Sequence, residues 1–377
     1  MIRVVHFIDT LFQGGAETLV KDYARFLDKK KFNLTVLCLR RTESPYERII
    51  ESFGVNVIYI CDYFGSCKTF CGRVKNKLAK TFGLYHLKIK RILFDLQPDV
   101  VHAHLAVLRY LKYADLNSTK IFYTVHSEPL RYWHCSTSIS KKEFEACCWL
   151  IKEKKLQLIA LHNSMRIGLN RLFGIDDTII INNGIDFSKF SNVLAKEKSR
   201  KKLKIPENTF VIGHLGRFIQ EKNHVFLLKI FARLIEKKSN SLLLLIGSGP
   251  LLDSIKLKIN ELHLENNVHI LSNRTDVPDL LNAMDVFAFP SIYEGLGIAL
   301  IEAQKMGLPC VVSDKVPSAA TISNLVTTLQ LTAAEEKWVD ALLKPKPKIV
   351  KYLNLESWDI RNVVKQLEIL YQKKSED

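Results

Sequence analysis

The stretch SIYEGLGIALIEAQKMGLPCVVSD, residues 291–314, decides which fold the second half of the chain adopts. It follows the apolar run 286–289 and ends in a second apolar run, 310–313, and both have the composition of buried strands. Between the two runs lie a loop with two glycines and a helical pattern that continues to about Lys305. A strand, a loop, a helix and a second strand in this order are typical of a parallel sheet covered by helices.

Two carboxylates in this stretch, Glu294 and Glu302, stand slightly more than two helical turns apart, so both can face one ligand. Carboxylates suit sugar hydroxyls, because each can accept a pair of hydrogen bonds. Gly295 and Gly297 let the backbone approach a ligand, and the N–H groups of a starting helix point outward. The alternative is a solvated Glu294 beside the helix dipole, but it does not explain why Glu302 interrupts an apolar run.

The same alternation of apolar runs and helical spacing extends along the chain, and 377 residues with 47% hydrophobic content suffice for two packed cores. An Asn-Asn-Gly turn at 182–184 and the Lys-rich stretch 192–204 place a boundary near residue 190. We predict an α/β fold with two Rossmann-like domains, 1–190 and 191–354, and a C-terminal helix within 355–377 that packs back on the first domain. The predicted strands are 3–8, 34–39, 55–60, 100–103, 121–125, 156–160, 178–181, 210–215, 241–246, 268–271, 286–289 and 310–313.

Two cations follow the first strand of the second domain, in the sequence GRFIQEK. Arg217 and Lys222 would lie at the carboxyl edge of the sheet, where α/β folds bind ligands. A guanidinium and an ammonium at one edge complement the charge of a diphosphate. The alternative is a surface network of ion pairs with Glu221.

A glycine-rich turn, with Gly14, Gly15 and Glu17 in the sequence GGAE, joins the first strand of the chain to a helix. Backbone N–H groups at such a helix start form an anion site. The Gly-x-Gly-x-x-Gly pattern of dinucleotide-binding enzymes is absent, so an oxidoreductase of that class is not expected.

Residues 294–309 resemble the Glu-x7-Glu motif of the retaining glycosyltransferases of GT-B fold, in particular family 4 (glycosyl transferases group 1), of the kind found in bacterial polysaccharide biosynthesis. Ala303, Gly307 and Pro309 keep the register of that motif. GRFIQEK resembles the G-R-x-x-x-x-K segment of the family, and GGAE resembles the turn that many members have after their first strand. The resemblance implies a GT-B fold, in which two Rossmann-like domains face each other across a cleft.

For the donor, the resemblance implies three kinds of contact. Glu294 and the backbone amides after it would hold the donor sugar, Glu302 would bind the ribose, and Arg217 and Lys222 would bind the phosphates. The backbone groups expected to contribute to the donor site are those of Gly295, Leu296, Gly297, Gly14 and Gly15.

Three histidines end predicted strands of the first domain. The resemblance implies that His126 hydrogen-bonds the donor sugar and stabilises the charge that develops in the reaction. His104 and Glu17 are predicted on the acceptor side, whereas His102 is interpreted as a structural residue.

The reaction implied by the resemblance moves a sugar from a nucleoside diphosphate sugar, expected to be a UDP-sugar, to a lipid-linked acceptor or a growing polysaccharide, with retention of configuration. The leaving phosphate oxygen would take the acceptor proton, and the cations would stabilise its charge. Because the chain has no Asp-x-Asp motif, no metal and no other cofactor is expected. The alternatives are a sugar-nucleotide epimerase of the same fold and a non-catalytic sugar-nucleotide-binding protein.

The net charge of +16 is concentrated in residues 1–190, which carry +11 of it, and residues 73–91 contain seven basic side chains and no acid. Such a stretch attracts anionic lipid or nucleic acid. No nucleic-acid partner is expected, because no recognisable nucleic-acid-binding motif is found. Apolar residues at 70, 74, 78 and 82 predict instead a helix that meets an anionic membrane surface. The alternative is that Val74 and Leu78 pack into their own domain.

Location is predicted from what the sequence does not contain. It has no apolar run long enough for a spanning helix and no recognised export signal. Its eight cysteines have no metal-binding or disulfide spacing and are interpreted as reduced thiols. We expect a cytoplasmic protein that can bind the inner face of the cytoplasmic membrane.

Overall fold

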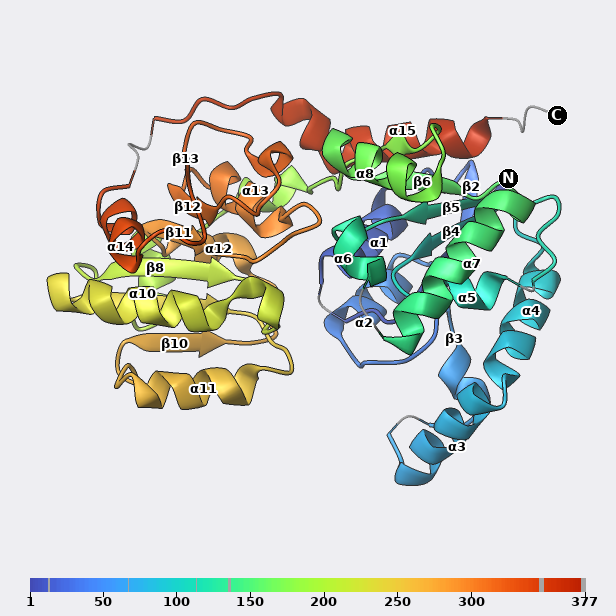
Figure 1. The fold of residues 1–377 in the computed structure, drawn as a ribbon, viewed down its shortest axis with the longest axis horizontal. Coiled ribbons are helices and arrows are strands. Elements are labelled where there is room, and N and C mark those ends of the chain that lie inside the picture. Colours follow the sequence, from blue (N-terminus) through green and yellow to red (C-terminus); the bar gives the residue numbers. More distant parts are fainter. Residues whose placement is uncertain (13, 67, 113, 135–136, 346–348, 374–377) are drawn as a thin grey trace. The chain divides into compact units, whose positions relative to one another are not determined.

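The computed structural model describes residues 1–12, 14–66, 68–112, 114–134, 137–345 and 349–373, and the chain divides into two compact units (Figure 1). Unit 1 consists of Met1–Gly184 and Ser357–Asp377, and unit 2 of Ile185–Glu356. The division lies a few residues before the predicted boundary near residue 190, and the last four residues of the predicted C-terminal segment lie outside the described residues.

Unit 1 is built on a seven-stranded parallel sheet in the order β3-β2-β1-β4-β5-β6-β7. Its central strands are buried on both faces, which explains why they are continuous apolar runs rather than alternating ones. The strands are β1 (Ile2–Ile8), β2 (Phe32–Cys38), β3 (Asn56–Tyr59), β4 (Val100–His104), β5 (Lys120–Thr124), β6 (Gln157–Ala160) and β7 (Ile179–Ile180).

Helices cover this sheet, and most of them connect one strand to the next. They are α1 (Gly15–Phe26), α2 (Pro45–Ser52), α3 (Phe70–Thr81), α4 (Leu84–Leu96), α5 (Leu108–Leu111), α6 (Pro129–His134), α7 (Ser138–Lys154), α8 (Asn163–Phe173) and α15 (Ile360–Gln372).

Helix α15 is far from the rest of unit 1 in sequence but belongs to its hydrophobic core and packs against α1. Its buried face recurs at helical spacing, through Ile360, Val363, Leu367 and Tyr371. Gly184 permits the approach, because a Cβ there would lie 2.6 Å from the Ile360 Cα. The C-terminal segment thus contributes a residue, Tyr371, to the middle of unit 1.

Unit 2 repeats the architecture with six parallel strands in the order β10-β9-β8-β11-β12-β13. The edge strand β13 was not predicted, because its sequence VTTL has too little apolar content to stand out. The strands are β8 (Phe210–Leu215), β9 (Ser241–Ile246), β10 (Val268–Leu271), β11 (Val286–Phe289), β12 (Cys310–Ser313) and β13 (Val326–Leu329). The helices are α9 (Lys196–Lys202), α10 (His224–Lys237), α11 (Leu252–Glu261), α12 (Val277–Asn282), α13 (Ile298–Lys305) and α14 (Glu335–Leu343).

Both sheets therefore have the strand order of doubly wound Rossmann folds, and the predicted fold class is confirmed. The order reverses between β1 and β4 in unit 1 and between β8 and β11 in unit 2. In such folds ligands bind at the carboxyl ends of the strands beside the reversal. Functional residues are therefore expected at these two edges.

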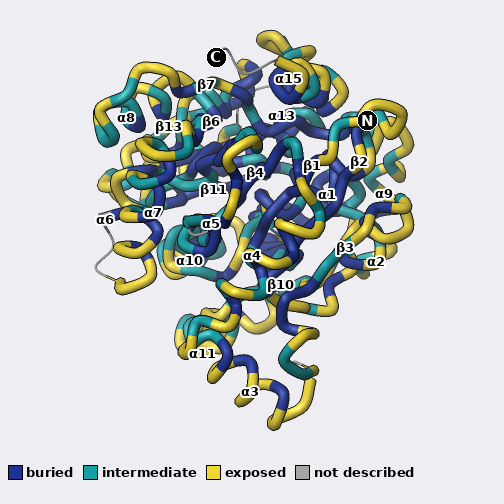
Figure 2. Tube along the Cα trace, turned by 90° about the vertical axis from the view of Figure 1, so that its right-hand side faces the viewer, coloured by how far each residue is buried: buried dark blue, intermediate teal, exposed yellow. Residues whose placement is uncertain are grey.

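Helices α3 and α4 extend from the body of unit 1, and much of α3 is exposed (Figure 2). The buried face of α3 consists of the small or polar residues Gly72, Asn76 and Ala79. Val74 and Leu78 are 41% and 50% exposed, so the alternative in which they pack into their own domain is wrong. Within the described part of the chain, no helix combines the length and the apolar character needed to span a bilayer.

Candidate functional site

The switch point of unit 2, where the strand order reverses between β8 and β11, brings together two segments that were predicted separately from the sequence. The loop after β8 carries Lys222, and the loop after β11 carries Glu294; the Lys222 Nζ lies 2.5 Å from the Glu294 Oε1. Both side chains are largely buried, with 16% and 10% of their surface exposed, so the pair is shielded from bulk water. A cation and a carboxylate 72 positions apart in sequence thus form one site.

The Glu294 carboxylate is fixed from a second side. The buried Ser291 hydroxyl donates to the same Oε1 at 2.7 Å, and the Ser313 hydroxyl donates to the Ser291 carbonyl at 2.5 Å. The ammonium of Lys222 also lies 4.8 Å from the ring centre of Phe289, within cation–π range. Ser291 and Ser313 were not predicted, since an isolated serine after a strand or at its last position carries no distinctive signal.

Among the described residues, Glu221 forms no ion pair with Arg217 or Lys222, so the surface network that was the alternative for these two cations is not found. Its carboxylate accepts a hydrogen bond from the Tyr293 hydroxyl at 2.8 Å, and its carbonyl accepts one from the Ile292 N–H at 2.8 Å. Arg217 is exposed, and no partner for its guanidinium is found among the residues that the structure describes. It is therefore available to an anion at this edge.

Close backbone packing shapes the same edge. Gly216 directly follows β8, and a Cβ there would lie 3.1 Å from the Lys222 Cδ, so glycine leaves room for the lysine. Gly247 and Gly249 follow β9, and a Cβ on Gly249 would lie 2.6 Å from the Phe218 carbonyl oxygen. Sequence reasoning missed this glycine pair, which could have been found as a Gly-x-Gly directly after a predicted strand.

The loop before α13 runs as predicted from the sequence. Gly295, Leu296 and Gly297 are buried, and Gly297 has a φ of +94°, a conformation that favours glycine. Helix α13 begins directly afterwards at Ile298, so its first N–H groups follow Glu294 closely in the sequence. Glu302 lies in the last half of α13 and is partly exposed.

In unit 1, Gly14 is the N-cap of α1 and no side chain caps it. The Glu17 carboxylate folds back so closely over Gly14 that a Cβ at that position would overlap it. Glu17 is 5% exposed and so is buried at the helix start, while Gly15 is exposed. The turn keeps an accessible helix N-terminus, but with an acid packed against it.

The predicted histidines of unit 1 do not all reach the surface. His104 is fully buried, and its two ring nitrogens lie 3.0 Å from His6 and 3.0 Å from His126, so the expectation that it faces an acceptor is corrected. His102 is fully buried, as its structural interpretation requires. His126 is partly exposed, and its Nδ1 is buried with no hydrogen-bond partner among the described residues. Sequence reasoning missed His6, which lies inside the first strand.

The fold and the matching family models identify a glycosyltransferase of the GT-B class. Residues 13–189 match the model described as Glycosyltransferase Family 4, and residues 195–343 match Glycosyl transferases group 1, so each half of the chain resembles the corresponding half of such enzymes.

Similar proteins agree with this class. EpsF of Bacillus subtilis, which carries a glycosyltransferase name, is 28% identical over 93% of this chain and 90% of its own. An Escherichia coli enzyme named UDP-Gal:alpha-D-GlcNAc-diphosphoundecaprenol alpha-1,3-galactosyltransferase is 30% identical over 55% of each chain. The crystal structure of Anabaena HepE in complex with UDP and glucose shares the fold, with a TM-score of 0.74, 18% identity, and coverage of 98% of this chain and 99% of that one.

Proposed function

We propose that this glycosyltransferase moves a sugar from a UDP-sugar to a lipid-linked acceptor or a growing polysaccharide, with retention of anomeric configuration, in the synthesis of a cell-surface polysaccharide. The observation that carries the proposal is the Lys222–Glu294 pair at the switch point of unit 2. It joins a group suited to phosphate with a group suited to sugar hydroxyls in one shielded place.

Charge compensation explains how the two charged side chains can stay largely buried when no donor is bound. Without a ligand, Lys222 and Glu294 neutralise each other at 2.5 Å. A diphosphate would compete for the ammonium, and the freed Glu294 oxygens would then accept from sugar hydroxyls while Ser291 keeps the carboxylate in place. Arg217, which is exposed, would bind the outer phosphate oxygens.

The chemical step needs positioning and charge stabilisation more than a protein nucleophile. In the proposed retaining step the acceptor oxygen bonds to the anomeric carbon on the face that the diphosphate leaves. The bond between carbon and phosphate oxygen breaks, and that oxygen takes the acceptor proton. The two cations would lower the barrier by stabilising the negative charge of the leaving diphosphate. We further propose that no metal is required.

The names of similar proteins support the donor and the acceptor. The Escherichia coli relative is named for a UDP-sugar and a lipid diphosphate acceptor, and HepE was crystallised with UDP and glucose. The glycosyltransferase names among the relatives, together with the matched families, disfavour the epimerase and the non-catalytic binding protein.

The test begins with a thermal-shift screen of UDP-, GDP- and dTDP-sugars, because a donor that binds the folded state raises the melting temperature. The donor that gives a shift is then incubated with a short polyprenyl-diphosphate sugar, and the anomeric configuration of the product is determined by NMR. Conversion of the donor without any acceptor would indicate an epimerase. A product of inverted configuration would refute retention.

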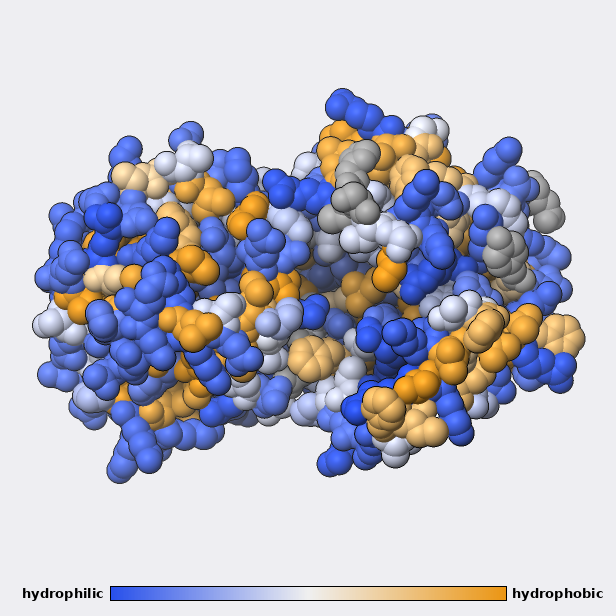
Figure 3. Space-filling model, turned by 60° about the horizontal axis from the view of Figure 1, so that its bottom comes forward, coloured by the Kyte–Doolittle hydropathy of each residue, from blue (hydrophilic) through white to orange (hydrophobic). Residues whose placement is uncertain are grey.

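We also propose that the enzyme works at the inner face of the cytoplasmic membrane, held there by α3 and α4. Figure 3 shows an apolar stripe beside hydrophilic surface over this region of unit 1. The residues that form it are exposed large apolar side chains: Phe70, Val74, Leu78, Phe82, Leu84 and Leu87. Lys75, Lys77 and Lys90 are exposed nearby, and each basic group near an anionic leaflet contributes about 1 kcal/mol.

Vesicle co-sedimentation tests the membrane proposal. Phe70 and Phe82 are 76% and 73% exposed, so changing both to Ser should abolish binding to vesicles with anionic lipid at low salt without unfolding the chain. Leu257→Ser is the matched control, because Leu257 is 70% exposed on α11 in unit 2 and should leave binding unchanged. If the wild type stays in the supernatant with anionic vesicles, the membrane proposal is wrong.

A further inference from the structure

Two loops meet at the switch point of unit 2, and each carries one member of the Lys222–Glu294 pair. The loop after β8 contributes the run Glu221, Lys222 and Asn223, and the loop after β11 contributes residues 290–294. Every side chain of the run contacts the second loop. Lys222 therefore lies between two residues that bind the same loop as it does.

Glu221 is bonded to the second loop through both its side chain and its backbone. The Glu221 carboxylate accepts a hydrogen bond from the Tyr293 hydroxyl at 2.8 Å, and the Glu221 carbonyl accepts one from the Ile292 N–H at 2.8 Å. A carboxylate can only accept, so the tyrosine is the donor, and a hydrogen bond to a charged acceptor is stronger than one between neutral groups. These two bonds fix Ile292 and Tyr293 relative to Glu221.

Asn223 adds a third bond from a backbone conformation that few side chains adopt. Its φ of +55° lies in the left-handed region, which glycine enters without strain and which asparagine tolerates better than most residues. The side chain, which a glycine would lack, donates from Nδ2 to the Pro290 carbonyl at 3.2 Å. Asn223 is also the N-cap of α10, but its side chain makes no capping bond there. The amide is thus used to hold the second loop and not to start the helix.

These three bonds do not depend on the ion pair, which opens in the proposed function when a diphosphate takes the Lys222 ammonium from Glu294. Opening removes the 2.5 Å contact between the two charged side chains. The bonds of Glu221 and Asn223 use no atom of either charged side chain, so they can persist in the open state. Persistence matters, because a small displacement of groups that act on a substrate lowers the rate strongly.

We propose that Glu221, Asn223 and Tyr293 are positioning residues for the transferase reaction. They form a clasp, made of the three hydrogen bonds described above, that keeps the two loops in register while Lys222 and Glu294 exchange their partners. What the two loops act on rests on the proposed function, whereas the clasp is a feature of unit 2 alone. Because the clasp fixes geometry and does not touch the substrate, its loss should lower kcat more than nucleotide affinity.

Hydrogen exchange of the full-length protein, with and without saturating UDP, tests the clasp without any assay of sugar transfer. The Ile292 amide is bonded to the Glu221 carbonyl, so it should exchange slowly and keep this protection when UDP is bound. Tyr293→Phe should speed its exchange about fivefold, as expected for one lost hydrogen bond. If UDP itself removes the protection of Ile292 in the wild type, the loops separate with the ion pair and the proposal is wrong.

Kinetics of two variants test the effect on the reaction. Tyr293→Phe should lower kcat about fivefold and Asn223→Gly about threefold, while the Kd of UDP stays within about twofold. Glycine adopts the backbone conformation of Asn223 without strain, so Asn223→Gly removes only the side-chain bond. Tyr352→Phe is the matched control, because its hydroxyl also donates within unit 2, to the Lys305 carbonyl at 3.1 Å at the far end of α13. If Tyr293→Phe and Asn223→Gly have the kcat of Tyr352→Phe, the clasp does not position the site.

Variants of Glu221 separate positioning from direct contact with the donor. In Glu221→Gln the amide oxygen can still accept from Tyr293, so kcat should stay near the wild-type value, whereas Glu221→Ala should lower it about fivefold. Adding Tyr293→Phe to Glu221→Ala should have little further effect, because both changes remove the same bond. Fully additive losses would mean that Glu221 acts on the substrate by itself, and they would overturn the proposal. Failure to detect sugar transfer with any donor would instead refute the proposed function, while exchange at Ile292 still decides whether the clasp exists.

Discussion

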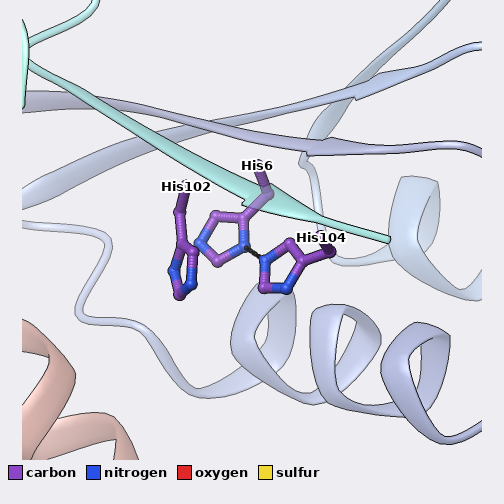
Figure 4. Close-up of side chains that lie close together, drawn as sticks. All are labelled: His6, His102 and His104. Atoms are coloured by element: carbon purple, nitrogen blue, oxygen red, sulfur yellow. Dashed lines mark hydrogen bonds between the residues drawn. The ribbon is translucent and has the colours of Figure 1, made fainter. Parts of the chain in front are cut away.

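The two switch points of this protein differ in the charge of the side chains that form them. In unit 2, the edge between β8 and β11 presents charged groups, with Lys222 and Glu294 paired and Arg217 exposed. In unit 1, the edge between β1 and β4 presents neutral imidazoles buried in a hydrogen-bonded row, which includes His6 and His104 (Figure 4). A charged site can bind and release a diphosphate, because its groups exchange one ionic partner for another. A neutral row cannot exchange charge in this way.

This difference predicts that acid lowers the stability of unit 1 strongly. The pKa of His6 is lowered to about 3, while an unfolded histidine has a pKa near 6.5. Between these values the unfolded chain binds a proton that the native chain does not, so stability falls as the pH drops below 6.5 and stops falling below the native pKa. Each such histidine lowers the free energy of unfolding by about 2 kcal/mol when the pH falls from 7 to 5.

Urea unfolding at pH 7 and pH 5 measures this loss, and labelling of buried thiols assigns it to a unit. Cys38, Cys61 and Cys147 are buried in unit 1, and Cys310 is buried in unit 2. Among the described residues, unit 2 has two buried histidines with lowered pKa values, His214 and His224, whereas unit 1 has three, His6, His102 and His104, as well as the partly exposed His126. The urea concentration that exposes the unit 1 thiols should therefore drop more on acidification. Equal drops in both units would contradict the comparison.

The same contrast explains which features could be predicted from the sequence. The site of unit 2 lies in two short segments, so Arg217, Lys222, Glu294 and the glycine loop could be found from local spacing. The sheets could be found too, except the Thr-containing edge strand β13. The hydrogen bonds around the buried histidines of unit 1 could not, because they join positions as far apart as His102 and Tyr371, and only the packing of α15 brings these two side chains within 2.6 Å. A lone histidine inside a strand carries no signal of what will face it.

The charged site is tested by removing its cations one at a time. Arg217→Ala and Lys222→Ala should each lower kcat at least about tenfold, because a charged contact to a leaving diphosphate contributes more than roughly 1.4 kcal/mol. Lys237→Ala is the control: this lysine is exposed in unit 2 and pairs only with the exposed Asp340 at 3.0 Å, so kcat should not change. Wild-type kinetics in both site variants would remove the phosphate-binding role from unit 2.

A smaller effect is expected at Glu302, the partly exposed acid of α13 that is predicted to bind the ribose. Glu302→Ala should weaken binding of the free nucleotide, without any sugar, by about fivefold, which corresponds to one hydrogen bond of roughly 1 kcal/mol. Isothermal titration with UDP gives the affinity, and Glu261→Ala on the exposed end of α11 is the control. Unchanged affinity would mean that the nucleotide is held by other groups of unit 2.

The smallest expected effect is that of a chelator. Because Arg217 and Lys222 can supply the positive charge that a leaving diphosphate requires, EDTA should leave the transfer rate within about twofold of the untreated enzyme. Adding back Mg²⁺ or Mn²⁺ should then do nothing. A loss of rate that Mg²⁺ restores would place a metal at the diphosphate and reduce the two cations to binding residues. A loss that only Zn²⁺ restores, with a lower melting temperature, would instead point to the cluster of His6, His102 and His104 as a structural metal site. The first outcome would revise the charged site of unit 2, and the second would revise the neutral histidines of unit 1.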